Sequence, residues 1–144
     1  MAIKLSPAVL ELLKQPVYVA LVTLGRDGSP HQTLVWTDTD GTHVLVNTVE
    51  GYQKLVNMRR DPRVSVLVRP GGDSPRWVSI SGEVAEITTE GAREHVEALS
   101  QRYTNRPYAM HGLGQRVLVK IAPTRVYESL ERRGAVNSRA QSGG

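Results

Sequence analysis

Two short turn sequences near the N-terminus constrain the fold of this chain most strongly. Asp27-Gly28 follows one apolar run, and Asp40-Gly41 separates a second run from a third. Asp-Gly supplies the positive backbone φ that tight β-hairpins require. The sequence therefore predicts an antiparallel meander of three strands, over residues 17–24, 31–37 and 42–48, with turns over residues 26–29 and 38–41.

Proline and glycine divide the rest of the chain into short elements. Ser6 is a good helix N-cap and Pro7 a good first helical residue, while Pro62 ends a second helix. Gly82 marks a bulge or bend within a long strand, and Pro123 is expected to separate the last two strands. The sequence thus predicts helices over residues 6–14, 51–60 and 88–103, and further strands over residues 63–68, 76–87, 116–121 and 124–129.

The order of these elements predicts a mainly β fold with flanking helices, an α+β arrangement. The strand–helix–strand repetition of a doubly wound parallel sheet is absent from the pattern. Hairpin-linked strands indicate an antiparallel β-barrel with helices packed at its ends or flank. Residues 132–144 have no periodicity, so we expect a disordered C-terminal tail after one domain over residues 1–131.

Charge and residue types argue against several classes of function. The net charge is +4, but residues 132–144 hold three arginines and no acid, which leaves residues 1–131 at +1. So small a charge argues against a broad nucleic-acid-binding surface. There is no cysteine, and the four histidines lack metal-like spacing, so we expect no metal site. No apolar run approaches the ~20 residues of a membrane span, and we expect a cytoplasmic protein without a membrane partner.

The strand end and short helix over residues 47–64 form the strongest candidate for a binding site. Gln53, Lys54 and Asn57 fall on or near one helical face, because residues three and four apart are neighbours. The start of that helix carries free N–H groups and partial positive charge, which suit phosphate. These side chains form a candidate grip for a phosphorylated cofactor. The alternative is a solvated helix face with a basic end.

The second predicted strand mixes polar side chains with a tryptophan. On the wall of a barrel, such polar groups can face a planar ligand that carries donors and acceptors at its ring edge. The alternative is an ordinary half-buried strand, with His31 and Gln32 in water and Trp36 as a packing residue.

Three motifs occur together in this chain. They are Gly-x-Pro-His at residues 28–31, Asn-Thr…Lys-x-x-Asn-x-Arg-x-Asp-Pro-Arg-Val over residues 47–64, and Gly-Glu-Val-Ala-Glu-Ile at residues 82–87. Over roughly residues 6–130 the chain resembles the pyridoxamine 5′-phosphate oxidase-like flavin-binding split β-barrel family. More narrowly, it resembles the actinobacterial branch that uses coenzyme F420, a deazaflavin. The resemblance implies an FMN-binding-like antiparallel split β-barrel and a homodimer with two equivalent cofactor sites at the subunit interface.

The resemblance also implies which side chains contact the cofactor. The strand of His31, Gln32, Thr33, Leu34 and Val35 is expected along the isoalloxazine-like ring, with Asn47 and Thr48 near the phosphate-side turn. Gln53, Lys54 and Asn57 are expected to hold the phosphate or polyanionic tail, with help from Arg60. Trp77 is expected to approach the ring from the partner subunit.

The implied activity is that of an F420-dependent oxidoreductase, which transfers a hydride between reduced deazaflavin and a small organic substrate. The same motifs fit an FMN-dependent enzyme, or a non-catalytic protein that binds a flavin or a tetrapyrrole. The pyridoxal-binding residues of the oxidase near its C-terminus have no clear match, which argues against pyridoxamine phosphate oxidation. No catalytic residue is assigned; His31 and Tyr108 are candidate proton donors, and residues 104–114 are the expected wall of the substrate pocket.

Overall fold

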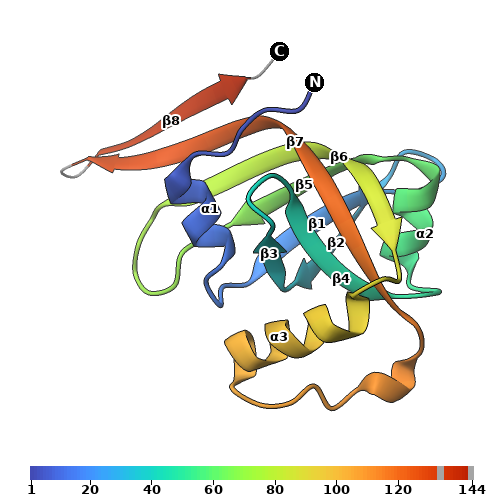
Figure 1. Cartoon of the computed structure of the whole chain (residues 1–144). Coiled ribbons are helices and arrows are strands. Elements are labelled where there is room, and N and C mark those ends of the chain that lie inside the picture. The colour runs from blue at the N-terminus through green and yellow to red at the C-terminus, as the bar shows by residue number, and fades with distance from the viewer. Residues whose placement is uncertain (133–134, 143–144) are drawn as a thin grey trace.

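The computed structural model describes residues 1–132 and 135–142, and one curled antiparallel sheet forms its centre (Figure 1). The strands are β1 (Val19–Leu24), β2 (Pro30–Val35), β3 (Thr37–Thr39), β4 (Val44–Val49), β5 (Arg63–Val68), β6 (Trp77–Thr88), β7 (Arg116–Arg132) and β8 (Ala135–Ser142). They follow one another across the sheet in the order β2-β1-β5-β6-β7-β4-β3, and β8 pairs with the distal part of β7.

A single residue joins the two edges of this sheet. Strand β2 ends at Val35 and β3 begins at Thr37, although the two strands lie at opposite ends of the strand order. Because consecutive Cα atoms are about 3.8 Å apart, the sheet must curl until its edges meet at Trp36. No ladder pairs β2 with β3 within the described part of the chain. The split β-barrel predicted from the sequence is confirmed.

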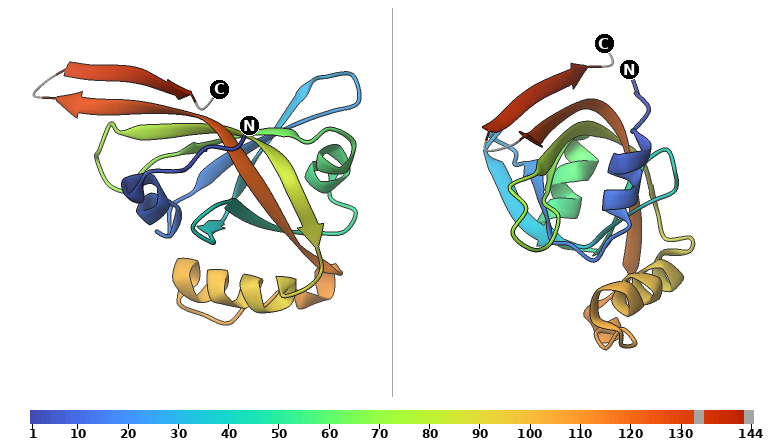
Figure 2. Two further views of the ribbon diagram at one scale, coloured as in Figure 1. Left: turned by 45° about the horizontal axis from the view of Figure 1, so that its top comes forward. Right: turned by 90° about the vertical axis from the view of Figure 1, so that its left-hand side faces the viewer.

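The α-helices are α1 (Pro7–Leu13), α2 (Gln53–Arg60) and α3 (Ala92–Thr104), and a 3-10 turn, η1, covers His111–Leu113. Helices α1 and α2 lie at opposite ends of the barrel, whereas α3 lies outside it beside β4 and β7 (Figures 1 and 2). Ser6 caps α1 as predicted, since its hydroxyl accepts a hydrogen bond from the N–H of Val9 at 3.3 Å. In the described ranges, no helix combines the length and apolarity needed to cross a membrane.

The barrel interior is a packed apolar core. Along β1, buried Val19, Leu21 and Thr23 alternate with half-buried residues, so every second side chain points inward. Leu13 of α1 and Leu55 of α2 are fully buried in the same cluster and fill the two ends. Each such buried leucine contributes roughly 1.5–3 kcal/mol through the apolar surface it removes from water. A ligand must therefore bind on the barrel wall rather than inside it.

The second hairpin differs from its prediction. Residues 31–37 do not form one strand, because Thr37, Asp38 and Thr39 pair with β4 rather than continuing the pairing with β1. Asp38 and Thr39 therefore belong to β3 instead of the turn. The turn begins at Asp40, whose Oδ1 accepts the N–H groups of Thr42 at 2.9 Å and His43 at 2.7 Å.

Pro123 does not separate two strands, contrary to the prediction. Strand β7 runs on from Arg116 to Arg132. Pro123 lies opposite Gly82, where the register between β6 and β7 shifts. A proline lacks a ladder donor and is tolerated at such an irregularity. The bulge predicted at Gly82 is confirmed and explains why the proline fits.

The C-terminal segment also differs from the predicted disordered tail. Ala135–Ser142 form β8, which pairs with β7 from Arg132 back to Arg125. Strand β4 covers β7 only from Arg116 to Ile121, so without β8 the later part of that edge would have unpaired backbone groups. Such an edge is a template for another strand. Residues 133–134 and 143–144 of the predicted tail lie outside the described residues.

Replacing Gly82 by alanine is expected to destabilise the protein. A Cβ at Gly82 would lie 2.6 Å from the carbonyl oxygen of Ala122 and 2.7 Å from Cγ2 of Ile121. The two strands would have to shift, at a cost of roughly 1–3 kcal/mol. Urea unfolding measures the change, with Gly71→Ala as the control, because a Cβ at Gly71 meets nothing within 4 Å. Equal stability of the two variants would contradict the close approach of β6 and β7.

Candidate functional site

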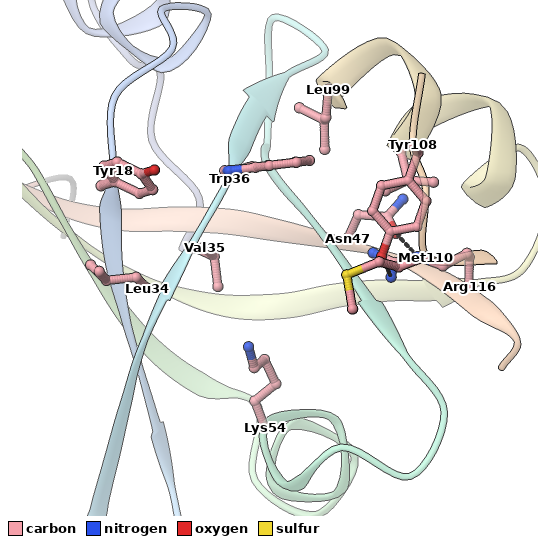
Figure 3. Close-up of a pocket in the computed structure, with 11 residues that line it drawn as sticks. Tyr18, Leu34, Val35, Trp36, Asn47, Lys54, Leu99, Tyr108, Met110 and Arg116 are labelled. Atoms are coloured by element: carbon pink, nitrogen blue, oxygen red, sulfur yellow. Dashed lines mark hydrogen bonds between the residues drawn. The ribbon is translucent and has the colours of Figure 1, made fainter. Parts of the chain in front are cut away.

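A pocket of about 270 Å³ opens on the barrel wall between β2, α2, α3 and the start of β7 (Figure 3). Apolar and aromatic side chains form most of its lining, and Lys54 reaches in from a different side than Asn47 and Arg116 (Figure 3). The lining residues are Tyr18, Leu34, Val35, Trp36, Asn47, Lys54, Val96, Leu99, Tyr108, Met110 and Arg116. A mostly apolar wall with a few polar groups is typical of small-molecule sites.

Trp36 is held rigidly at the point where the two sheet edges meet. Its ring stacks on Tyr103, with centroids 5.1 Å apart and an interplanar angle of 17°, and it meets Tyr108 edge-on at 6.5 Å. Tyr103 is itself fixed, because its hydroxyl donates to the carbonyl of Val17 at 2.7 Å and accepts the N–H of Thr37 at 3.1 Å. The indole is thus a preorganised aromatic surface for a planar ligand.

Lys54 is the first cation of the pocket. Its half-buried side chain reaches from α2 toward Val35 (Figure 3). Burial, together with the positive charge of Arg116, lowers the pKa of Lys54. No carboxylate among the described residues forms an ion pair with it. An anionic ligand would offset both effects, because it favours the charged ammonium.

Arg116 is the second cation, and its side chain is almost fully buried, with 9% of the residue exposed. Its Nε donates to Oδ1 of Asn47 at 2.8 Å, and its Nη1 donates to the hydroxyl of Tyr108 at 2.9 Å. Both partners are neutral, and no described acid pairs with the guanidinium. Burial lowers the pKa of Arg116. Two cations without counter-ions therefore share one pocket, and this arrangement suits an anion.

A chain of polar side chains continues behind Asn47, away from the pocket. Nδ2 of Asn47 donates to the carbonyl of Ala92 at 2.8 Å and lies 3.2 Å from Nδ1 of His95. Nε2 of His95 lies 3.2 Å from Oδ2 of Asp38, and Nη1 of Arg102 donates to the other oxygen of Asp38 at 3.0 Å. The carboxylate therefore pairs with the cation of Arg102 and accepts a hydrogen bond from His95, whereas the two pocket cations stay uncompensated.

The structure brings some of the predicted cofactor residues to the pocket and leaves others outside it. Those in its lining are Leu34, Val35, Asn47 and Lys54, and those outside it are His31, Gln32, Thr33, Thr48, Gln53, Asn57, Arg60 and Trp77. Trp77 stacks instead on Tyr127 at 5.8 Å, and Thr48 is buried in the barrel wall. Their contacts with a cofactor stay predictions, as does the approach of Trp77 from a partner subunit.

The two amides predicted to grip phosphate bind each other. Gln53 Nε2 donates to Oδ1 of Asn57 at 2.8 Å, and Asn57 Nδ2 donates to the hydroxyl of Thr23 at 3.0 Å. Arg60 turns to the same place, where its Nη2 donates to Asn57 Oδ1 at 3.1 Å and to the carbonyl of Leu24 at 3.0 Å. These side chains fasten α2 to β1 and leave Lys54 as the member of the predicted grip that lines the pocket.

Several lining residues were missed by the sequence reasoning. They are Tyr18, Val96, Leu99 and Arg116. Trp36 was considered as a packing residue of the second strand, and Tyr108 and Met110 belong to residues 104–114, the expected wall of the pocket. Arg116 reaches Asn47 because β4 pairs with β7, with Asn47 opposite Leu118. The two residues are 69 positions apart, and no local pattern reveals that register. The available signal is only a lone arginine at the start of a strand, after the irregular segment of residues 104–114.

Comparisons with known proteins agree with the fold. The family model described as pyridoxamine 5'-phosphate oxidase matches residues 5–130. A solved structure named F420 reductase is 25% identical, with a TM-score of 0.73 over 81% of this chain and 93% of that chain. A conserved hypothetical protein from Mycobacterium tuberculosis is 28% identical, with a TM-score of 0.71 over 93% of both chains.

A more distant solved structure shows the fold alone. It is a putative pyridoxamine 5'-phosphate oxidase from Listeria innocua, 23% identical, with a TM-score of 0.65 over 84% of this chain and 94% of that chain. None of the curated proteins is similar enough to this chain to match.

Asp38 is expected to make stability depend on pH in acid. Burial opposes its ionisation, but hydrogen bonds from His95, the N–H of Thr39 and Arg102 outweigh burial and lower the pKa of Asp38 from 3.8 to about 2. A carboxyl with a lowered folded-state pKa stabilises the fold above its unfolded pKa and loses that contribution as the pH falls through the folded value. Asp38→Asn should therefore cost roughly 1–2 kcal/mol near neutral pH and less as the pH falls.

Urea unfolding of both proteins between about pH 6 and pH 2 measures this difference. The exposed Asp73→Asn is the control and should follow the wild type at every pH. A cost of Asp38→Asn that does not change with pH would show that the carboxylate is not stabilised by its partners.

Proposed function

We propose, because the chain belongs to the pyridoxamine 5'-phosphate oxidase family, that it is an oxidoreductase using a reduced F420 deazaflavin as hydride donor to a small organic substrate. The observation that carries this proposal is the pair of cations without counter-ions, Lys54 and Arg116, beside the fixed aromatic surface of Trp36. F420 and FMN share this combination, a flat redox ring joined to a negatively charged tail. When bound, either cofactor supplies the hydride chemistry.

Two observations favour F420 over FMN. The structure named F420 reductase, at 25% identity, and the motifs of residues 28–31 and 47–64 support the deazaflavin. FMN is the second candidate, because the family also binds flavins and the same cations would hold its phosphate. A protein that binds either molecule without turnover is the third.

The chain's own residues supply binding, orientation and a proton. Lys54 binds the negative tail, and Leu34 with Trp36 covers the ring and excludes water from one side. Tyr108 is the candidate proton donor: its hydroxyl accepts a hydrogen bond from Arg116 and so keeps its own proton for a ligand. The neighbouring guanidinium would stabilise the phenolate that remains after transfer.

We further propose that the protein acts as a homodimer. Leu34 and Tyr18 are each 67% exposed, and Leu67 is 47% exposed, on the outward face of β2, β1 and β5. Ala20 pairs with both Leu34 and Leu67, so this apolar face is continuous across the three strands. Exposed apolar patches mark interaction sites. Tyr18 and Leu34 also line the pocket, so a second copy on this face would deepen a cavity that is small for a ligand site.

Lys54→Ala is expected to weaken binding of the phosphorylated cofactor by about 1.5–3 kcal/mol, or roughly 10- to 150-fold in Kd, the scale of a charge-assisted hydrogen bond. Titration of the purified protein with reduced F420 and, separately, with FMN measures both affinities. Lys4→Ala is the control, since that lysine is exposed and far along the chain from the pocket. An unchanged Kd would remove Lys54 from the site.

The same titrations decide between the three functions. Saturable binding of F420 with reduction of an enone, a quinone or a bilin supports the proposed enzyme. Binding of FMN alone would replace the cofactor, and tight binding with no turnover of any such acceptor would favour the non-catalytic alternative.

Leu67→Glu is expected to convert the dimer into a monomer, because it places a charge within the apolar face. Light scattering after size-exclusion chromatography measures the mass. Val56→Glu, at a 43% exposed position on α2 outside this face, is the control and should stay dimeric. A wild-type chain that is already monomeric would overturn the proposal of a dimer.

A further inference from the structure

We propose that Arg116 is a second anion-binding residue of the pocket, and that Asn47, held in turn by His95 and Asp38, positions its guanidinium. This inference rests on the proposed function, because it assigns a role within the same pocket. The ligand group that it names is a phosphate or carboxylate able to accept hydrogen bonds from a guanidinium. His95 and Asp38 are positioning residues, since neither lines the pocket.

Arg116 has donors that are free to bind an anion. A guanidinium has five N–H donors. Nε–H is used by Asn47 and one Nη1–H by Tyr108, and the remaining donors have no partner among the described residues. The side chain lines the pocket, so a ligand bound there would lie beside the guanidinium. An oxyanion that accepts two of them would make the paired contact that arginine favours.

The hydrogen bonds of Asn47 fix the orientation of its amide. Its nitrogen donates to the carbonyl of Ala92, which can only accept, so its oxygen must face Arg116. The same nitrogen lies 3.2 Å from Nδ1 of His95, which must therefore be the accepting nitrogen of the ring. The hydrogen-bond network thus assigns the His95 proton to Nε2, from which it is donated to Asp38 at 3.2 Å.

The hydrogen bonds of this network all run in one direction, from Arg116 toward Asp38. Arg116 donates to Asn47, Asn47 donates to His95, and His95 donates to Asp38. Only this arrangement of protons satisfies all three bonds. Arg102 holds the far oxygen of Asp38 at 3.0 Å and fixes that end. Loss of His95 would leave Asn47 with one restraint on its nitrogen side. The amide could then rotate, and a nitrogen turned toward Arg116 would oppose the guanidinium.

The competing explanation is that the network only fastens α3 to the sheet. Asp38 lies on β3, Asn47 on β4, and His95 and Arg102 on α3, so the bonds do tie the helix to two strands. A fastening role would affect stability alone. A positioning role affects anion affinity, and it is recoverable by a side chain with the same donor and acceptor.

The experiment compares Arg116→Gln, His95→Leu and His95→Gln with the wild type. The ligands are the cofactor that the wild type binds, F420 or FMN, and its phosphate-free ribityl form (hereafter the phosphate-free form), which carries the same ring. Arg116→Gln is expected to raise the Kd of the phosphorylated form roughly 10- to 100-fold, while the Kd of the phosphate-free form changes by less than about twofold. Arg125→Gln, an exposed arginine on the same strand, is the matched control and should change neither.

His95→Leu is expected to reproduce part of this loss, about 5- to 10-fold and confined to the phosphorylated form. His95→Gln should restore the affinity to within about twofold, because its amide oxygen can accept from Asn47 and its nitrogen can donate to Asp38. Thermal unfolding is recorded for each variant. If His95→Leu lowers the melting temperature but leaves the ratio of the two Kd values unchanged, the network is only structural and the positioning role is overturned.

Inorganic pyrophosphate, followed by ³¹P NMR, separates this inference from the proposed function. If the wild type binds neither cofactor but binds pyrophosphate in a way that Arg116→Gln abolishes, the anion site stands and the oxidoreductase assignment fails. If the wild type binds F420 or FMN and the Arg116→Gln variant binds the same cofactor equally tightly, the proposal that Arg116 binds the anion is overturned. Absence of binding of all three probes to the wild type would overturn both.

Discussion

The one-residue connection at Trp36 determines the architecture of this protein and the place of its pocket. Strands β2 and β3 lie at opposite edges of the sheet, so a link this short closes the barrel without hydrogen bonds across the seam. Val35 on one side of the link is buried in the core, and Trp36 faces the pocket beside the exposed Leu34. Because the interior is filled by side chains, the seam is where the wall offers both apolar surface and space.

The charge in this pocket is a cost that the rest of the fold must offset. Lys54 and Arg116 are both partly or largely removed from water, and their charges repel each other. The nearest carboxylate in the network, Asp38, is already occupied by His95 and Arg102. An acidic side chain in the pocket would stabilise the protein without ligand. Folding therefore does not explain why the two positive charges lack a counter-ion, whereas binding of an anionic ligand does.

Local rules predicted the elements, and non-local pairing decided which side chains meet. The N-cap at Ser6 and the bulge at Gly82 depend on a few neighbouring residues, and both are readable from the sequence. The rule that residues three and four apart share a helical face correctly brought Gln53 and Asn57 together. The direction of that face depends on how α2 docks on Thr23 of β1, which no local pattern encodes. Arg116 was missed for the same reason, since its place follows from the register of β4 and β7.

Helix α3 connects the two sides of the polar wall. Through His95 it reaches Asn47 and so Arg116, and through Glu97 it accepts the N–H of Tyr108 at 3.1 Å and pairs with His111. The residues that meet the polar part of a ligand are therefore aligned by a helix outside the barrel. The barrel and α2 contribute Leu34, Val35 and Lys54 to the pocket, whereas α3 and the segment after it lie outside the barrel core and can change in sequence without disturbing its packing. Ligand specificity on this fold is therefore expected to depend on α3 and the segment after it. The stability of the shared barrel is expected to depend on neither.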